Sequence, residues 1–479
     1  MTGARDAAAR PRTRQRPRAR TRLRDRPFFV PLLLGVVVAV VHSLSPTPQS
    51  GDSRLSVVTA WRFATHFDLR LEGYPAVQAL AAQGDLVASG GHLVPFFPWP
   101  TMLLALPGTL VAALFGVDPG ALSIADPNLT WLVEVPTASV MVALTAVLLH
   151  RIVLTLPQPW ATPRTALVTA LVFAFGSMAW SVGSRALWQQ TASMLFIAAA
   201  VVALQRLERR PRWGLLLGLW LTLAVVMRPT NAILFALIAL WVLWRRRSAF
   251  LPAVGGAAIV AVPFAAFSFS QYGTVLPAYY LPTRMVSTGV YELAESIAVN
   301  LVSPSRGLLF FAPVLVIAAI GVVLRLRGKT FTSVDLVFIL AFACQFVVIA
   351  RFGSTHGFTF GPRLMLDTLP LLMILAVPAL SRLAHPRRET GAAATALVAA
   401  VGLLVAAGFF VNATGALLRS AVCWNVSPVL LDAAPERVWD WGDVQFLRPY
   451  ALLAEGTAPI DLVAPSCTTN LAVSPGAIR

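Results

Sequence analysis

Charged side chains are scarce in this chain of 479 residues. Asp, Glu, Lys and Arg together make up 12% of it, and 57% of it is hydrophobic, whereas soluble domains carry about 25% charged residues. The mean hydropathy is +0.73, and many apolar runs approach the twenty or so residues that cross a bilayer as a helix. The sequence therefore excludes an ordinary soluble domain and predicts an all-α polytopic membrane protein.

Lysine is almost absent, because Lys329 is its one occurrence, so the net charge of +17 comes from arginine. In a soluble chain this charge would suggest nucleic-acid binding. Here most arginines gather at the ends of apolar runs, and ten lie in the first 26 residues. This is the positive-inside pattern, which holds such segments in the cytoplasm. We expect residues 1–27 to be a cytoplasmic tail, and we expect no nucleic-acid partner.

Cysteine is also rare, with three in the chain. Cys344 lies inside an apolar run and is expected to be inert. Cys423 and Cys467 both lie in the C-terminal tail, where an extracytoplasmic location would let them form a disulfide. Two unpaired thiols are the alternative.

Several catalytic motifs are missing. The sequence has no P-loop, no dinucleotide-binding glycine motif, no HExxH and no metal-ligand spacing. A soluble nucleotide-sugar site is therefore not expected, and no cofactor is predicted, although a divalent metal stays open. If the chain is an enzyme, its energy must arrive with the substrate, for example as an activated lipid phosphate.

The apolar runs predict about eleven transmembrane helices in a domain covering 28–411. The first run, Phe28 to Leu44, lacks a convincing cleavage site and is read as a retained span. The arginine clusters orient the runs, with the N-terminus in the cytoplasm and the C-terminus outside the plasma membrane. The predicted spans are about 28–44, 132–149, 165–183, 187–204, 213–227, 231–244, 250–268, 307–324, 333–350, 364–383 and 391–411.

One further apolar run, 96–116, does not fit this topology. A full span there would leave an uncharged, mildly acidic turn inside and would invert every later arginine cluster. We therefore expect a re-entrant or interfacial helix within the first extracytoplasmic loop. Three long segments then face outside, namely the first outer loop 45–131, the second large outer loop 269–306 and the tail 412–479.

The first outer loop opens on Gly51-Asp52-Ser53-Arg54. We expect a short helix from Asp52 to Thr65, whose positive N-terminal end would favour an ionised carboxylate. An ionised carboxylate within reach of a hydroxyl can act as a general base. The simpler alternative is that Asp52 caps this helix and does nothing more.

Arginines predicted at the outer face are informative because the positive-inside bias disfavours them there. A guanidinium grips phosphate through two hydrogen bonds, so a cluster of them suggests a clamp for a lipid phosphate. Snorkelling to headgroups or pairing with nearby acids is the alternative for any single one. The residues are Arg185, Arg228, Arg284, Arg306, Arg351 and Arg363.

Other polar and aromatic groups fall at the same predicted level. Gln189, at the start of a span, could line a cavity, and His356 could carry a proton or donate to substrate or be a solvated loop residue. Tyr279 and Tyr280, with Trp99, could form an aromatic wall for a sugar, although interfacial belts use the same residues.

Taken in order, these motifs resemble the GT-C class of integral-membrane glycosyltransferases, in its actinobacterial type. The resemblance covers nearly the whole chain. It is carried by the acid after the first span, by Arg228-Pro229-Thr230-Asn231, by Ser303-Pro304-Ser305-Arg306-Gly307-Leu308-Leu309-Phe310, by Phe358-Thr359-Phe360-Gly361-Pro362-Arg363, and by Trp439-Asp440-Trp441 with Gln445-Phe446-Leu447-Arg448. The chain has Gln189-Gln190 where many members carry a histidine.

The resemblance implies a role for each group of residues. Asp52 would deprotonate the acceptor hydroxyl in an inverting transfer. Many members pair this acid with a second one, for which Asp68, Glu72 and Asp85 are all candidates. Arg306 and Arg363 would hold the donor phosphate, assisted by Arg284 and Arg351. The substrate would also contact a wider set, Arg54, Arg185, Gln189, Arg228, Tyr279, Tyr280 and His356.

The predicted function is transfer of a sugar from a polyprenyl-phosphate donor to an envelope glycan, lipid or protein at the extracytoplasmic face. A lipid or glycolipid transporter or flippase is the first alternative, but it favours charges near the middle of spans, and here they lie at span ends. A non-catalytic scaffold for envelope assembly is the second.

Overall fold

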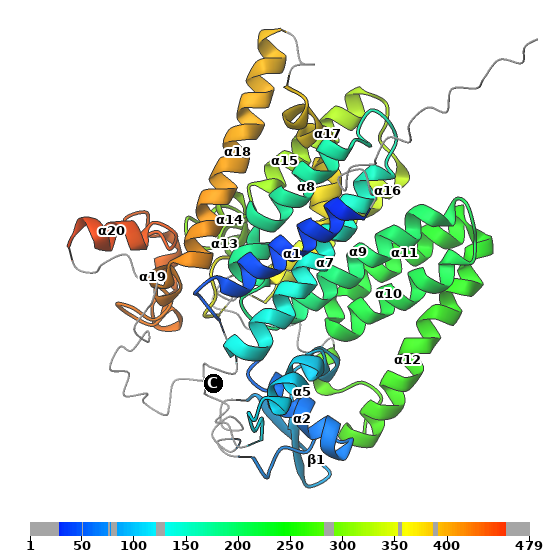
Figure 1. Ribbon diagram of the computed structural model, residues 1–479, viewed down its shortest axis with the longest axis vertical. Helices are drawn as coiled ribbons and strands as arrows, with labels where there is room; N and C mark the ends of the chain where they lie inside the picture. Colours follow the sequence, from blue (N-terminus) through cyan, green and yellow to red (C-terminus); the bar gives the residue numbers. More distant parts are fainter. Residues whose placement is uncertain are drawn as a thin grey trace, which may run out of the picture.

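The computed structural model describes residues 28–49, 51–74, 77, 84–120, 130–281, 292–352, 357–386 and 391–456. Within these ranges the chain is almost entirely helical, as predicted, with one two-stranded sheet. Figure 1 shows a bundle of long helices with a smaller layer of short elements at one end, around α2 and β1.

Each of the predicted spans contains a helix. These are α1 (Phe29–Leu44), α7 (Val135–Leu154), α8 (Pro163–Phe175), α9 (Gln189–Leu207), α10 (Trp213–Met227), α11 (Ala232–Arg245), α12 (Phe250–Tyr272), α15 (Val314–Arg327), α16 (Ser333–Ala350), α17 (Leu369–Ala384) and α18 (Ala392–Leu417). Six helical segments in the described ranges are long and apolar enough to cross a membrane. The chain is thus a multi-pass helical protein, while eleven crossings stay a prediction.

Two spans predicted as continuous are interrupted. The range 165–183 divides into α8 and the π-helical turn η3 (Ala179–Gly183), separated at Gly176. The range 307–324 divides into α14 (Leu308–Phe311) and α15, with Pro313 at the break. Proline has no N–H to donate and its ring clashes with the preceding turn, which favours a break in the helix at this position.

The most buried helix is α17, in which every side chain from Leu369 to Leu380 is buried. In contrast, α12 and α18 have mostly exposed apolar surfaces and lie at the two edges of the view in Figure 1. Lipid tails are as apolar as these side chains, so such surfaces are compatible with a bilayer. The core of the bundle therefore centres on α17, which also carries the candidate site at its N-terminal end.

Glycines let α10 and α12 pack with their backbones in contact. A Cβ added at Gly218 on α10 would lie 1.9 Å from the Ala253 carbonyl oxygen, and one at Gly256 on α12 would lie 1.8 Å from the Leu215 carbonyl oxygen. Helix pairs in membranes rely on such small residues because no hydrophobic effect drives them together.

The end layer comprises α2 (Ser56–His66), the hairpin of β1 (Leu86–Ser89) and β2 (His92–Pro95), α4 (Trp99–Leu103) and α5 (Leu106–Leu114). It packs on the bundle through Val57 and Ala60 of α2, which join a cluster with Met141 and Met227. The run 96–116 is therefore two short helices and not one long one. Its position relative to the membrane stays a prediction.

The hairpin is a feature that the sequence analysis missed. Its turn is Gly90-Gly91, both at positive φ, and Ser89 pairs with His92 across it. Two glycines between short apolar runs are a hairpin signal, since such turns need positive φ at both central positions.

The tail contributes α19 (Arg419–Cys423), α20 (Arg448–Ala454) and short 3₁₀ turns, and it packs near α13 (Leu293–Val302) through Val299 and Trp424. Cys344 is a free thiol and Cys423 is disulfide-bonded. Cys467 lies outside the described residues, so its pairing with Cys423 stays a prediction.

The α10–α12 contact can be tested with one added methyl group. We expect Gly256→Ala to lower the thermal unfolding temperature of the purified protein, because overpacking costs about 1–3 kcal/mol or more when backbone must shift. Gly255→Ala is the matched control, since a Cβ there meets only Leu215 Cδ1 at 4.0 Å. Equal unfolding temperatures for the two variants would contradict this packing.

Candidate functional site

Asp52 lies in the turn that joins α1 to the end layer. The expected helix starts later than predicted, at Ser56, and the residue at its N-cap is Leu55, with no side-chain capping bond. Asp52 is therefore not a helix cap, and the simpler alternative for this residue is wrong. Its carboxylate is available for another partner.

That partner is Arg363, 311 positions further along the chain. The Arg363 Nη2 donates to Asp52 Oδ1 at 3.0 Å, and both side chains are mostly buried. The same guanidinium stacks over the Trp188 ring at 4.4 Å. The structure thus brings together one acid, one arginine and one indole from the first loop, from η8 (Arg363–Thr368) and from the residue before α9.

Tyr279 belongs to an aromatic cluster near this group. The Tyr279 hydroxyl donates to Gln189 Oε1 at 3.0 Å, and its ring packs edge-on against Phe96 and Phe97. Burial raises the pKa of Tyr279 and the negative charge of Asp52 raises it further, while Arg228 and Arg363 act in the opposite direction. These opposing effects place Tyr279 within electrostatic reach of both charged groups of the pair.

Tyr280 faces another element. Its hydroxyl donates to the Val226 carbonyl oxygen at 2.6 Å, at the end of α10. Together the two tyrosines fasten the segment after α12 to the segment between β2 and α4 and to the bundle.

Of the three candidate second acids, Asp85 is the one coupled to Asp52. Arg54 donates to Asp85 at 2.6 Å. Burial raises the pKa of Asp85, the Arg54 charge opposes this shift, and the nearby Asp52 charge adds to it. Asp68 instead pairs with Arg62 at 2.8 Å, and Glu72 pairs with His92 at 2.6 Å.

Arg228 forms a buried ion pair with an acid that the sequence analysis did not single out. Its Nη1 donates to Asp367 Oδ1 at 2.7 Å, and Gln345 Nε2 donates to the same oxygen at 2.9 Å. Asp367 lies four residues after Arg363 on η8, inside a predicted span. Burying an acid within an apolar run costs free energy, so such an acid usually has a charged partner or belongs to a functional site. The presence of Asp367 in an apolar run was therefore the sequence signal for this pair.

Arg306 and Arg185 both donate hydrogen bonds to other groups of the protein. Arg306 is fully buried and donates to Gln445 Oε1 at 2.6 Å, to Asn425 Oδ1 and to the Ser305 carbonyl oxygen. Arg185 is fully buried and donates to the carbonyl oxygens of Ser45, at 2.6 Å, and of His42, at the end of α1.

The predicted substrate contacts of both arginines stay predictions. Carbonyls at a helix C-terminus lack partners within the helix, and Arg185 donates to such carbonyls at the end of α1. Arg306 joins the chain before α14 to the tail, and its Nη2 also donates to the Gly357 carbonyl oxygen at 3.4 Å. Their donors are occupied because a buried guanidinium must satisfy its N–H groups within the protein.

The remaining predicted residues are less informative. Arg351 is exposed at the end of α16, and Arg284 and His356 lie outside the described residues. Across the described part of the chain, no group of three His, Cys, Asp or Glu side chains could hold a metal ion.

Two donors beside the pair lack an acceptor. Arg363 Nε and Gln189 Nε2 are buried and have no hydrogen-bond partner among the described residues. A buried polar group without a partner costs about 1–3 kcal/mol. Such groups next to a carboxylate are suited to receive an anionic or hydroxyl oxygen from a ligand.

The Arg228–Asp367 pair holds η8, and its removal can be measured. We expect Asp367→Asn to destabilise the protein by about 3–5 kcal/mol, because it leaves a buried guanidinium without its counter-charge. Glu208→Gln, which breaks an exposed pair with Arg246, should cost about 0–1 kcal/mol. Thermal unfolding in detergent distinguishes them, and similar small losses would mean that the buried pair does not hold η8.

Comparison with known proteins gives a likeness to a solved structure and no match to a family. No family model matches the chain and no curated protein matches it. The solved structure of ArnT from Cupriavidus metallidurans bound to undecaprenyl phosphate is similar, with a TM-score of 0.49 and 16% sequence identity over 91% of this chain and 73% of that chain.

Proposed function

We propose that this protein is a glycosyltransferase that moves a sugar from a polyprenyl-phosphate donor to an envelope glycan, lipid or protein at the extracytoplasmic face of the membrane. The observation that carries the proposal is the Asp52–Arg363 ion pair, 3.0 Å long, between the end layer and the bundle. It sets a potential base beside a potential phosphate ligand.

In the proposed reaction, Asp52 accepts the proton of the acceptor hydroxyl. That oxygen attacks the anomeric carbon of the donor sugar and forms the new glycosidic bond. The bond from this carbon to the donor phosphate oxygen breaks, and polyprenyl phosphate leaves with the bonding electron pair. The energy comes from the donor, so no nucleotide is required at this step.

Arg363 links both halves of this reaction. Its Nη2 is directed to Asp52, while its Nε is without a partner among the described residues. One guanidinium can therefore orient the base and hold an oxygen of the leaving phosphate, whose charge grows in the transition state. Stabilisation of developing charge by donors already in place is usually the largest catalytic effect.

Trp188 and Tyr279 support the proposal by limiting movement and water around the pair. The Trp188 ring lies under the Arg363 guanidinium, and its indole N–H donates to the Val182 carbonyl oxygen at 3.1 Å. Asp85, paired with Arg54, is the second acid that we favour, since its charge acts on the same site. Excluding water protects an activated donor from hydrolysis.

Removing the carboxylate is the first test. We expect Asp52→Asn to lower the rate of sugar transfer by about 10²–10⁴-fold, the range that general base catalysis contributes. Transfer would be measured in membranes supplied with radiolabelled polyprenyl-phosphate sugars and acceptor, with unfolding temperature as the check on folding. Asp68→Asn is the matched control because its carboxylate is paired with Arg62 outside the site.

Two results would contradict the proposal. Normal transfer by Asp52→Asn would remove this residue as the base. Binding of the donor without transfer by the wild-type protein, across a panel of acceptors, would favour a scaffold.

Replacing the guanidinium is the second test. We expect Arg363→Lys to keep a positive charge near Asp52 but to reduce transfer at saturating donor by at least about tenfold, because an ammonium cannot hold two groups in a fixed fork. Arg210→Lys, at an exposed position after α9, should leave the rate unchanged. Equal rates in both variants would show that Arg363 does not serve base and phosphate together.

A further inference from the structure

A cavity with both polar and apolar walls lies at the other end of the bundle from Asp52. Its volume is about 230 Å³, and it is lined from the chain after α7, from α9, α11, α15, α16 and α17. The helix α9 starts at Gln189, beside the candidate active site, and reaches the cavity at Leu204 and Gln205. At 1.5 Å per residue, these ends are separated by roughly 23 Å.

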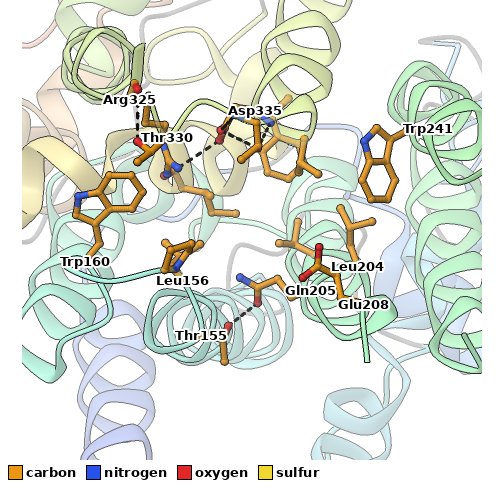
Figure 2. Close-up of a pocket in the computed structure, with 16 residues that line it drawn as sticks. Thr155, Leu156, Trp160, Leu204, Gln205, Glu208, Trp241, Arg325, Thr330 and Asp335 are labelled. Carbon is orange, nitrogen blue, oxygen red and sulfur yellow. Dashed lines mark hydrogen bonds and ion pairs between the residues drawn. The ribbon is translucent and has the colours of Figure 1, made fainter. Parts of the chain in front are cut away.

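The cavity combines one guanidinium, two carboxylates, polar side chains and two indoles. Figure 2 shows Arg325 and Asp335 directed toward each other on one wall, with Trp160 and Trp241 on either side and Gln205 and Glu208 opposite. The deeper wall is apolar, formed by side chains such as Val201, Phe338 and Ile374. An amphipathic ligand fits this division better than a simple ion.

Arg325 is buried but has unused bonding capacity. One of its nitrogens, Nη2, donates to the Ile374 carbonyl oxygen at 2.9 Å, and the guanidinium stacks on Trp160 at 4.6 Å. Its Nε has no hydrogen-bond partner among the described residues. The side chain is 4% exposed, so this donor cannot be satisfied by open solvent, and an acceptor within the cavity would relieve the cost.

The opposing acid also keeps an open oxygen. Asp335 Oδ2 is used in the capping box with Thr332. Its Oδ1 lies 3.5 Å from Arg325 Nη1, longer than the 2.7–2.9 Å or so of a good charge-assisted hydrogen bond. Arg325 can therefore bind an anion and Asp335 Oδ1 can bind a cation within the same cavity.

The composition around this cavity is typical of a membrane interface. The helices α9, α11 and α15 each line the cavity and each carry arginine in their last turn, and two tryptophans line it, as is usual at such an interface. Basic pockets between helices at such an end bind lipid headgroups. A plain anion would meet Asp335 and Glu208, and a plain cation would meet Arg325.

We propose that this cavity binds the zwitterionic headgroup of a phosphatidylethanolamine-type phospholipid, with the phosphate on Arg325 and the ammonium on Asp335. The ammonium N–H groups donate to the open Asp335 oxygen, and Glu208 lines the same cavity. A choline headgroup lacks these N–H donors and fits less well. This site is independent of the proposed transfer reaction, because it lies across the bundle from Asp52.

The first experiment uses the soluble headgroup as the probe. The full-length protein, delipidated in detergent, is unfolded thermally with sn-glycero-3-phosphoethanolamine, glycerol 3-phosphate or ethanolamine. We expect a saturable rise in unfolding temperature with the complete headgroup, because a ligand that binds the folded state stabilises it, and no comparable rise with either half. No rise, or an equal rise with glycerol 3-phosphate alone, would overturn the proposal.

Variants test whether the rise in unfolding temperature comes from binding in the cavity. Arg325→Met and Asp335→Asn should abolish the rise, whereas Arg327→Met, an exposed arginine on the same helix, should keep it. If Arg325→Met does not fold, Arg325→Lys serves in its place, since it keeps the charge but loses the Nε donor. Loss of the rise in Arg327→Met as well would overturn the assignment.

A lipid experiment identifies the source of the headgroup. The protein is reconstituted in mixed phosphatidylethanolamine and phosphatidylcholine bilayers and released for native mass spectrometry. We expect wild type to retain phosphatidylethanolamine preferentially and Asp335→Asn to lose this preference. Binding of the soluble headgroup without retention of the lipid would exclude a phospholipid as the occupant.

Discussion

Buried guanidinium groups must find partners within the protein, and this constraint organises the structure. Arg185, Arg228, Arg306, Arg325 and Arg363 are all largely buried, where an unpaired charge is very costly. Their partners are backbone carbonyls, aspartates, amide side chains of the tail and aromatic rings. The positions of loops and helix ends follow from these contacts.

The candidate site is one consequence. The short η8 element carries Arg363 toward Asp52 and, four residues later, Asp367 toward Arg228. The buried Arg228–Asp367 pair fixes η8 against α10 and α16, so Arg363 reaches the first loop from a rigid support. Arg306, expected to bind phosphate with Arg363, also secures the tail through Gln445 and Asn425. The catalytic proposal is carried by Arg363, and phosphate binding by the other arginines of the predicted cluster stays a prediction.

The same constraint produces two different environments at the two ends of the bundle. At the Asp52 end, the Asp52 carboxylate and the Arg363 guanidinium are in direct contact at 3.0 Å, and the donor without a partner among the described residues is Arg363 Nε. At the other end, Arg325 and Asp335 are 3.5 Å apart and both keep bonding capacity. A single helix, α9, has Gln189 at the proposed active site and Leu204 and Gln205 in the cavity wall. The distance between the two proposed sites is therefore set by the length of this helix.

The sequence by itself indicated the helical class and the positions of the long helices, and it singled out Asp52 as a candidate base. Apolar runs and arginine clusters report directly on burial in lipid and on charge distribution, which are local properties of the chain. Only the tertiary structure decided that Asp52 meets Arg363 and not Arg306, that Asp85 is the acid coupled to it, and that Asp367 anchors Arg228. Those pairings join residues up to 311 positions apart. Several arginines precede or follow apolar runs, and their local sequence does not show which acid each one pairs with. The physical reason is that the free energy of a buried charge depends on its actual neighbours in space, which no local pattern records.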